Sequence, residues 1–313
     1  MNVKDKVAVC SRSLSANKLL RAELLSRYQH VKFNDEGLSL AGDELKEFIF
    51  GCSKVIVGLE VIDSDMLHDL PNLEVVSKYG VGIDMIDTVA FAREGIRLGW
   101  TGGVNKRSVS EMVILFALAL SRNICTANNE VKSGIWNQFK GNLLTGKTVG
   151  IVGFGNIGKD LSLLLQPFNC KILVYEKLDA AFIGDNYNQN QVSLKELLEK
   201  SDIVSLHTPL NSDTRNLIGA RELETMKDSA YLINTSRGGL VDEAALCSAL
   251  QSSQIAGAAF DVFNQEPPEN STLLSLSNFI CSPHMAGTSI ETILAMGMAA
   301  IDGLDKNQIP VEN

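Results

Sequence analysis

The sequence predicts an α/β protein with two domains, each built on a parallel β-sheet. The chain has 313 residues, about twice the length of an average domain. Short apolar, β-branched stretches alternate with helical patterns along most of it, which is typical of βαβ units. The alternation breaks at Thr101-Gly102-Gly103 and restarts at Thr148. We therefore expect one sheet before the break and a second, doubly wound sheet after it.

The elements expected in the first part of the chain follow from the pattern of its apolar residues. Strands are expected over residues 7–10, 54–58, 74–79 and 96–100, and an amphipathic helix over residues 16–28. After the break, Ser108 and Glu111 have the spacing of a capping box, which predicts a helix from there to about Arg122. Because this helix is apolar nearly all round, we expect it to be buried on most sides, in the core or at a subunit interface.

The second sheet is predicted from six further apolar stretches. They cover residues 148–152, 171–175, 203–206, 230–234, 256–260 and 279–282, and helical patterns fill most of the gaps. A last helix is expected over residues 290–304. This order predicts a doubly wound α/β domain.

The composition excludes several classes of protein. Hydrophobic residues make up 45% of the chain and charged residues 21%, as in a folded globular protein. The 28 basic against 37 acidic residues give a net charge of −9, so we expect no general binding to nucleic acid or to an anionic membrane. The longest apolar run, residues 112–120, is too short to span a membrane, and the N-terminal one is too short for a signal peptide. The six cysteines lack metal-site spacing, so we expect free thiols, no metal and a cytoplasmic location.

Residues 153–158, Gly153-Phe-Gly155-Asn-Ile-Gly158, have the pattern G-x-G-x-x-G between an expected strand and an expected helix. In this context the pattern predicts a dinucleotide site. Gly153 allows a tight turn, Gly155 lets the backbone approach a pyrophosphate, and Gly158 lets helix and strand pack closely. The free N–H groups at the helix N-terminus would bind the phosphates.

An acid follows the glycines at the expected distance. Glu176 ends the next strand, 18 residues after Gly158 (176 − 158), where a carboxylate can accept hydrogen bonds from a ribose. It would repel a 2′-phosphate, which favours NAD over NADP, although the neighbouring Lys177 weakens this preference. An ordinary tight turn with an exposed glutamate is the alternative.

A second glycine pattern is misleading. Residues 141–148 match G-x-x-x-x-G-K-[ST], the pattern of ATP-binding loops. Such a loop must follow a strand and begin a helix, whereas this stretch follows polar residues and leads into a strand. We therefore do not expect ATP binding.

Three polar side chains after expected strands suit hydride chemistry on a carbonyl. His284 can exchange a proton near neutral pH, and Arg237 suits bidentate binding of a carboxylate. Glu266 would stabilise a protonated imidazole beside it. The alternatives are a structural histidine, a surface ion pair and a loop acid. All three lie at strand ends, where the active sites of such sheets are found.

Together these segments resemble the D-isomer-specific 2-hydroxyacid dehydrogenase family over about residues 73–287. The resemblance rests on residues 153–158, 234–243, 257–267 and 282–287. Two of these segments, residues 235–243 and 259–267, are most similar to phosphoglycerate dehydrogenases and hydroxypyruvate reductases. The resemblance implies an NAD-dependent oxidoreductase with a Rossmann-type domain over residues 102–285. A smaller flavodoxin-like domain would comprise residues 1–101 with 286–313, with the active site in the cleft.

The resemblance also implies roles for single residues. Arg237, Glu266 and His284 would be the substrate clamp, the tuning acid and the proton donor. The backbone at Gly80, Val81 and Gly82 would bind the substrate carboxylate. Members are commonly dimers built around the helix that matches residues 108–122. The implied cofactor contacts are Gly153, Gly155, Asn156, Ile157, Gly158, Glu176, His207, Thr208, Pro209, Thr235, Ser236, Arg237, Asp261, His284 and Gly287.

The substrate side chain stays open because the sequence departs from the family pattern. Phosphoglycerate-specific members carry an arginine just after the strand that matches residues 54–57, where this chain has Gly58-Leu59-Glu60. Lys78 and Lys140 could replace it, but the charge of Glu60 would repel a phosphate. A phosphoglycerate dehydrogenase-like enzyme is the main expectation.

Two alternatives remain, a reductase of unphosphorylated hydroxypyruvate or glyoxylate and a dinucleotide-sensing binding protein. Formate oxidation is disfavoured, because the related formate dehydrogenases carry glutamine where Glu266 stands.

Overall fold

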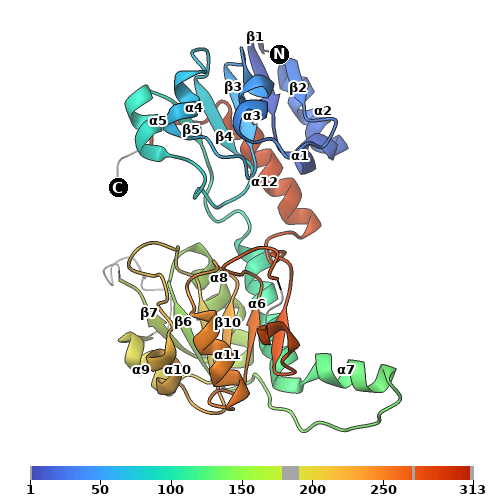
Figure 1. The fold of residues 1–313 in the computed structure, drawn as a ribbon, viewed down its shortest axis with the longest axis vertical. Helices are drawn as coiled ribbons and strands as arrows, with labels where there is room; N and C mark the ends of the chain where they lie inside the picture. The colour runs from blue at the N-terminus through green and yellow to red at the C-terminus, as the bar shows by residue number, and fades with distance from the viewer. Residues whose placement is uncertain (1, 178–189, 270–271, 311–313) are drawn as a thin grey trace. The chain divides into compact units, whose positions relative to one another are not determined.

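The computed structural model describes residues 2–177, 190–269 and 272–310. The chain forms two compact units, Met1–Asn105 with Ser289–Asn313, and Lys106–Thr288. Each unit has its own parallel sheet with flanking helices (Figure 1), which confirms the expected α/β class. The chain passes between the units at residues 105/106 and 288/289, four and three residues after the boundaries expected at 101/102 and 285/286.

The first unit has a five-stranded parallel sheet in the order β2-β1-β3-β4-β5. Its strand β2 was not expected from the sequence, because it lies at the sheet edge and buries only its end residues, Tyr28 and Phe33. The strands of this sheet are β1 (Asn2–Val9), β2 (Tyr28–Phe33), β3 (Lys54–Val57), β4 (Val75–Lys78) and β5 (Arg97–Gly99).

The expected helix over residues 16–28 is wrong in its bounds. Two helices, α1 (Arg12–Ala16) and α2 (Lys18–Arg27), meet at Asn17. The Asn17 side chain accepts hydrogen bonds from the N–H groups of Leu19 and Leu20. It thereby begins a second helix, whereas the periodicity of apolar residues predicted a single continuous helix here.

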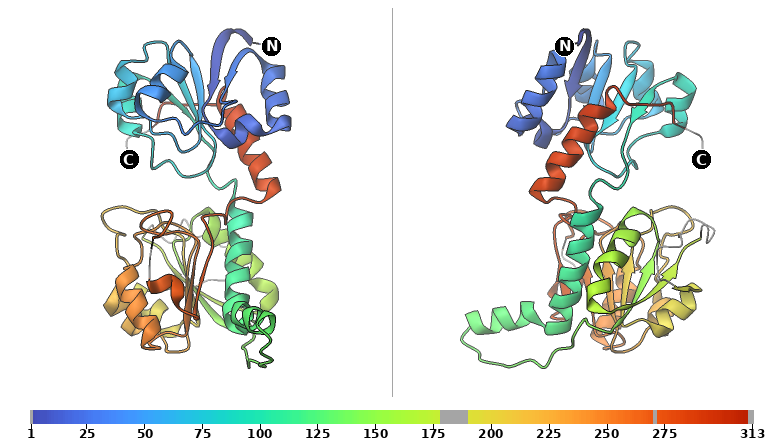
Figure 2. Two further views of the ribbon diagram at one scale, coloured as in Figure 1. Left: turned by 45° about the vertical axis from the view of Figure 1, so that its right-hand side comes forward. Right: turned by 180° about the vertical axis from the view of Figure 1, so that it is seen from behind.

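Helices cover both faces of this sheet. On one face lie α3 (Gly42–Ile49), α4 (Ser64–His68) and α5 (Thr88–Glu94), and on the other lie α1, α2 and α12 (Ile290–Gly303). Figures 1 and 2 show α3 and α12 on opposite faces. The alternation of β1 explains this arrangement, since Val7 and Val9 pack in the core with α12 and Ala8 packs in the other core. The last helix expected from the sequence is thus confirmed.

The second unit has a seven-stranded parallel sheet in the order β12-β11-β10-β9-β6-β7-β8. The expected strands at 148–152, 171–175 and 203–206 have those bounds in the structure. The strands are β6 (Thr148–Val152), β7 (Lys171–Tyr175), β8 (Asn190–Gln191), β9 (Ile203–Leu206), β10 (Tyr231–Asn234), β11 (Gly257–Phe260) and β12 (Phe279–Cys281). The chain runs from β6 outward to β7 and then returns to β9 on the other side of β6, so the strand order reverses between β6 and β9. In doubly wound sheets, ligands bind at such a reversal.

Two layers of helices cover the second sheet. One face carries α6 (Lys106–Arg122) and α8 (Asn156–Leu164), and the other carries α9 (Leu194–Lys200), α10 (Ala220–Thr225) and α11 (Glu243–Gln251). α7 (Ile124–Lys132) has no buried residue and projects from this unit in Figure 1 and in the right view of Figure 2. The sequence analysis did not predict α7, because it has no face that packs on a core.

The N-cap expected for α6 is wrong. The helix begins at Lys106, so Ser108 is not its N-cap; instead the Ser108 hydroxyl donates a hydrogen bond to the Ala286 carbonyl, 2.7 Å away. Ser108, which the capping-box spacing assigned to the helix N-terminus, thus makes a tertiary hydrogen bond instead. Beyond its first turn the helix exposes one stripe, on which Leu115 and Leu118 are 56% and 37% exposed, so most of its sides are buried as expected.

No helix in the described residues is by itself long and apolar enough to cross a membrane; α6 and α7 meet that criterion only as a pair bent by 62°. The misleading glycine pattern at residues 141–148 leads directly into β6, as expected, and begins no helix.

Candidate active site

The glycine-rich turn joins β6 to α8 at the reversal of strand order. Gly153 has a φ of +92°, and a Cβ on it would lie 2.7 Å from the carbonyl carbon of His207. Only glycine fits both constraints. A Cβ on Gly158 would lie 2.4 Å from the Gly153 oxygen, whereas Gly155 faces open space. The turn is therefore closed towards the protein and open at the residue that precedes α8.

The first turn of α8 is available to a ligand. Asn156 and Ile157 begin the helix, and within the described ranges no side chain caps its first N–H groups. α8 is held by α6, because Arg107 donates two hydrogen bonds of 2.9 Å to the buried Asp160 carboxylate and Ser110 donates one to the Ile157 carbonyl. A rigid helix with free N–H groups is suited to bind a pyrophosphate.

Glu176 lies at the end of β7, and its carboxylate is bent towards the glycine-rich turn. One oxygen accepts a hydrogen bond from the Phe154 N–H (2.7 Å) and the other accepts one from the Lys177 N–H (2.8 Å). The Lys177 ammonium pairs with Asp213 at 3.2 Å. Asp213 thus places a negative charge beside Lys177, the cation that weakened the preference for NAD expected from the sequence.

Unsatisfied polar atoms surround the same edge of the sheet. Among the described residues, His207 Nδ1, Thr208 Oγ1 and Thr235 Oγ1 are buried and have no hydrogen-bond partner. They follow β9 and β10, the two strands next to β6 on that side. Burial lowers the pKa of His207 to about 3, so its ring is neutral near pH 7. Buried polar atoms normally have partners, and a polar ligand such as a dinucleotide would supply them. The residues therefore fit the expected cofactor.

The loops after β9 and β10 are tied together. The Ser236 hydroxyl donates a hydrogen bond of 2.7 Å to the Thr208 carbonyl, next to the exposed Pro209. The buried Asn234 side chain donates to the Arg237 carbonyl (2.8 Å) and accepts from the Ser236 N–H (3.1 Å). Asn234 therefore shapes the turn that presents Arg237. The sequence analysis gave it no such role, although an amide at the end of a buried strand was a usable signal.

Arg237 follows β10, and its guanidinium donates a hydrogen bond to the Ser236 carbonyl at 2.8 Å. The next residue brings its loop against the loop of Glu266. A Cβ on Gly238 would lie 1.9 Å from the Phe263 carbonyl oxygen, so the two backbones are in direct contact. The Arg237 turn and the Glu266 loop are thus held as one surface.

His284 and Glu266, 18 residues apart in sequence, are brought together. His284 Nδ1 lies 2.7 Å from one Glu266 carboxylate oxygen, and the other oxygen accepts from the Phe263 N–H at 3.0 Å. Both side chains are partly exposed, 53% for His284 and 37% for Glu266. Because the carboxylate occupies Nδ1, Nε2 is the nitrogen that can face a substrate. A histidine oriented in this way can donate a proton to a carbonyl oxygen.

Asp261 fixes the turn that carries His284. Its carboxylate is buried and accepts hydrogen bonds from the Met285 and Ala286 N–H groups, both at 2.8 Å, and from the Ser282 hydroxyl. His284 itself has a φ of +51°, a conformation that non-glycine residues rarely adopt. The buried anion at the end of β11 holds the backbone in this conformation. Gly287, half-buried, follows the turn.

In the first unit, the loop after β4 carries Gly80, Val81 and Gly82. Gly80 has a φ of +115°, and the Val81 carbonyl accepts a hydrogen bond of 2.9 Å from the Trp100 indole. Lys78 is buried beneath this loop, and its ammonium donates to the Gly58 and Tyr79 carbonyls. Lys78 therefore joins the loops after β3 and β4. Lys140 is exposed and belongs to the second unit.

All six cysteines are free, as expected. In the part of the chain that the structure describes, no three His, Cys, Asp or Glu side chains are grouped so that they could hold a metal ion.

Comparison with known proteins identifies the family. The profile of the D-isomer specific 2-hydroxyacid dehydrogenase NAD-binding domain matches residues 114–286. A glyoxylate reductase from Thermofilum pendens is 40% identical over 78% of this chain and 74% of its own length. A hydroxypyruvate reductase from Thermotoga maritima is 32% identical over 91% of this chain and 93% of its own. Other relatives are named D-3-phosphoglycerate dehydrogenase, and the chain spans about half of their length.

A solved structure agrees with these relatives. A putative D-isomer specific 2-hydroxyacid dehydrogenase from a Polaromonas species superposes with a TM-score of 0.86 and 28% identity, covering 96% of this chain and 95% of its own. The chain therefore belongs to the D-isomer-specific 2-hydroxyacid dehydrogenases, NAD-dependent oxidoreductases that transfer a hydride between nicotinamide and C2 of a 2-hydroxy or 2-oxo acid.

Proposed function

We propose that this dehydrogenase reduces small 2-oxo acids, with His284 as the proton donor and Arg237 as the substrate clamp. The observation that carries the proposal is the contact of 2.7 Å between His284 Nδ1 and Glu266, which leaves Nε2 for the substrate. NADH supplies the hydride when it is bound. His284 donates a proton to the C2 oxygen, and Glu266 stabilises the imidazolium and fixes the orientation of the ring.

Substrate binding is assigned to Arg237 and to the loop of Gly80, Val81 and Gly82. A guanidinium can hold the C1 carboxylate and the C2 oxygen through parallel hydrogen bonds. The loop can add backbone N–H groups, because no Cβ of Gly80 or Gly82 blocks the approach of an anion. Arg237 is thus expected to contribute both to the binding of the acid and to the polarisation of its carbonyl.

NADH is proposed to bind at the edge formed by the loops after β6, β7, β9 and β10. Gly155, Asn156 and Ile157 would approach the pyrophosphate, and Glu176 would accept from the adenosine ribose. The adenosine side would satisfy the buried atoms of His207 and Thr208. The unpartnered Thr235 hydroxyl supports this placement, since it lies in the same group of loops.

The test is the oxidation of NADH with glyoxylate, hydroxypyruvate and phosphohydroxypyruvate. Turnover of any of these, with D-stereochemistry at C2 of the product from hydroxypyruvate, supports the proposed function. Arg237→Ala should raise the KM for the 2-oxo acid and lower kcat. Tight NADH binding without turnover of any 2-oxo acid would refute the proposed function and favour a dinucleotide-sensing protein.

We also propose that the protein forms a homodimer through α6 and α7. α7 has no buried residue, although Ile124 and Val131 on it and Ile135 and Trp136 after it are apolar and 51–82% exposed. Such a patch is unusual on a monomer and suits an interface. Analytical ultracentrifugation should give twice the chain mass, and Trp136→Asp should shift the equilibrium towards monomer. A monomer at micromolar concentration would contradict this.

The free cysteines support the proposal of a reducing compartment, the cytoplasm. Two of the six, Cys125 and Cys281, are exposed and would be liable to oxidation elsewhere. Thiol labelling directly after cell lysis should find all six reduced.

A further inference from the structure

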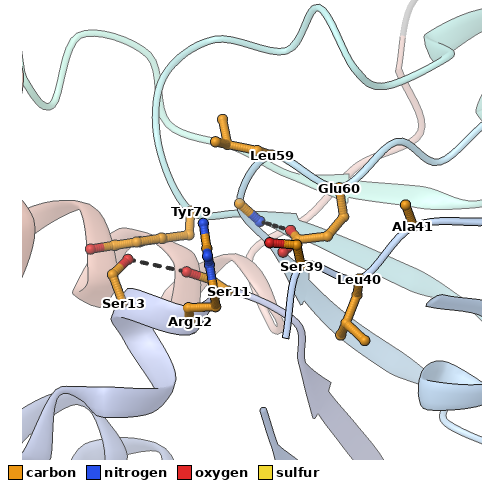
Figure 3. A pocket seen from close by; sticks show the side chains of 10 residues that line it. Ser11, Arg12, Ser13, Ser39, Leu40, Ala41, Leu59, Glu60 and Tyr79 are labelled. Carbon is orange, nitrogen blue, oxygen red and sulfur yellow. Dashed lines mark hydrogen bonds between the residues drawn. The ribbon is translucent and has the colours of Figure 1, made fainter. Parts of the chain in front are cut away.

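A cavity lined by both apolar and polar side chains opens at the carboxyl edge of the first sheet. Its volume is about 500 Å³, which is within the usual range for small-molecule sites. The loops after β1 and β3, together with Tyr79 after β4, form most of its wall, and Figure 3 shows their side chains facing one hollow. The cavity is much larger than a two-carbon acid needs, so it has room for a substrate with a longer arm.

The cavity is joined to the loop that the proposed function assigns to the substrate carboxylate. Tyr79 lines the cavity and directly precedes Gly80. Lys78 donates to the Gly58 carbonyl in the cavity wall and to the Tyr79 carbonyl, 3.0 Å away. A Cβ on Gly80 would lie 3.2 Å from the Lys78 ammonium nitrogen. One buried lysine therefore holds both the cavity wall and the start of the carboxylate loop.

Two opposite charges line the cavity, and they are used differently. Glu60 is bent onto its own turn, where one carboxylate oxygen accepts a hydrogen bond of 2.5 Å from the Gly58 N–H. Arg12 is exposed to the cavity, and among the described residues no carboxylate lies within 4.0 Å of its guanidinium. The structure thus gives the acid a partner within the protein and leaves the guanidinium open to one from outside.

Hydroxyl groups line the cavity together with this guanidinium. Ser11 and Ser13 lie with their hydroxyl oxygens 3.3 Å apart, and both line the cavity together with Tyr79 (Figure 3). Gly58 lets the β3 loop approach them, since a Cβ there would lie 3.3 Å from the Ser11 Cβ. An arginine among hydroxyl donors is suited to an oxyanion such as a phosphate ester or a carboxylate.

We propose that Arg12 is a specificity residue that binds an anionic group on the distal arm of the substrate. The inference rests on the proposed function. It assigns the enzyme to 2-oxo acids whose chain beyond C2 ends in a phosphate ester or a second carboxylate. The charge comes from the first residue of α1, a position for which the sequence offered no candidate.

The test compares kcat/KM for NADH-dependent reduction of 2-oxo acids that differ in the arm. Phosphohydroxypyruvate and oxaloacetate carry anionic arms, hydroxypyruvate and 2-oxobutyrate carry neutral ones, and glyoxylate has none. The wild type should prefer an anionic arm, and the better of the two anionic substrates identifies phosphate or carboxylate. Arg12→Gln should lower the ratio of kcat/KM for that substrate over glyoxylate by about 10–100-fold, the usual loss on removing a charged hydrogen-bond partner.

Two further variants make the test specific. Arg93→Gln replaces an exposed arginine on α5 of the same unit; it is the matched control and should leave the ratio at its wild-type value. Glu60→Gln should raise the ratio, because it removes from the cavity a negative charge that repels the anionic arm of the substrate. An unchanged ratio in Arg12→Gln, or a wild-type preference for neutral arms, would overturn the inference while the proposed function stands. No turnover of any 2-oxo acid would refute both.

Discussion

Asp261 offers a direct test of how the protein positions His284. The Asp261→Asn substitution keeps the shape of the side chain but replaces one carboxylate oxygen with an NH₂ group. In the native turn, one oxygen accepts from the Ser282 hydroxyl and the Met285 N–H, and the other accepts from the Ala286 N–H. An asparagine can satisfy only one of these two positions, so a buried N–H group of the turn then faces another donor.

The expected decrease in the free energy of unfolding follows from the hydrogen bonds that the substitution removes. Each bond to a charged group contributes about 1.5–3 kcal/mol, and a buried donor left without an acceptor costs about 1–3 kcal/mol. We expect Asp261→Asn to lower the free energy of unfolding by about 2–4 kcal/mol. A shift of His284 by about 1 Å would lower kcat by about 100-fold.

The assay combines urea unfolding with the kinetics of 2-oxo acid reduction. Asp213→Asn is the control, because it removes one member of an exposed ion pair with Lys177 and should change the stability by less than about 1 kcal/mol. If Asp261→Asn weakened NADH binding but left both stability and kcat unchanged, Asp261 would be a cofactor contact only, and its role in holding the turn would be refuted.

Two further predictions concern the cofactor edge. Gly153→Ala should destabilise the protein by at least about 1–2 kcal/mol and weaken NADH binding, because an L-residue is strained at a φ of +92° and its Cβ would contact the His207 backbone. Thermal unfolding measures the loss of stability, and NADH titration measures the loss of affinity. A smaller effect than that of Gly155→Ala on these two quantities would contradict the reasoning. The pKa of His207 is lowered to about 3 in the folded state, so the unfolded chain binds the extra proton below about pH 6.5 and stability falls as the pH decreases. Between pH 7 and pH 5 this loss should be about 2 kcal/mol, and urea unfolding should show it in the wild type and in the exposed-site control His30→Gln but not in His207→Gln; equal losses in all three would count against a buried neutral ring.

The central strands were predictable because both of their faces are buried. β3, β6 and β9 are mostly apolar or β-branched, interrupted only by Lys54, Gly150 and Ser205, and short runs of this kind are typical of buried parallel strands. The edge strand β2 was missed because only its end residues, Tyr28 and Phe33, are buried and three of the four residues between them are exposed. α7 was also missed, because most of its nine residues are polar and none is buried, so its few apolar residues do not form the wide stripe of a core-facing helix.

The site was predictable in its residue types but not in its connections. The sequence placed Glu266 and His284 after separate strands, yet only the packing of the loops after β11 and β12 brings them within 2.7 Å. The hydrogen bonds of Asp261 to the turn depend on the same tertiary contact. Arg12 was missed because a single arginine after a strand has no motif, and its environment comes from loops distant in sequence.

The most direct measurement of the central claim is the turnover of His284→Gln with NADH and the best 2-oxo acid from the substrate panel. General acid catalysis contributes about 10²–10⁴-fold in rate, so kcat should fall by that factor. The matched control His68→Gln replaces an exposed histidine of the first unit and should retain wild-type turnover. Full turnover by His284→Gln would contradict the assignment of His284 as the proton donor.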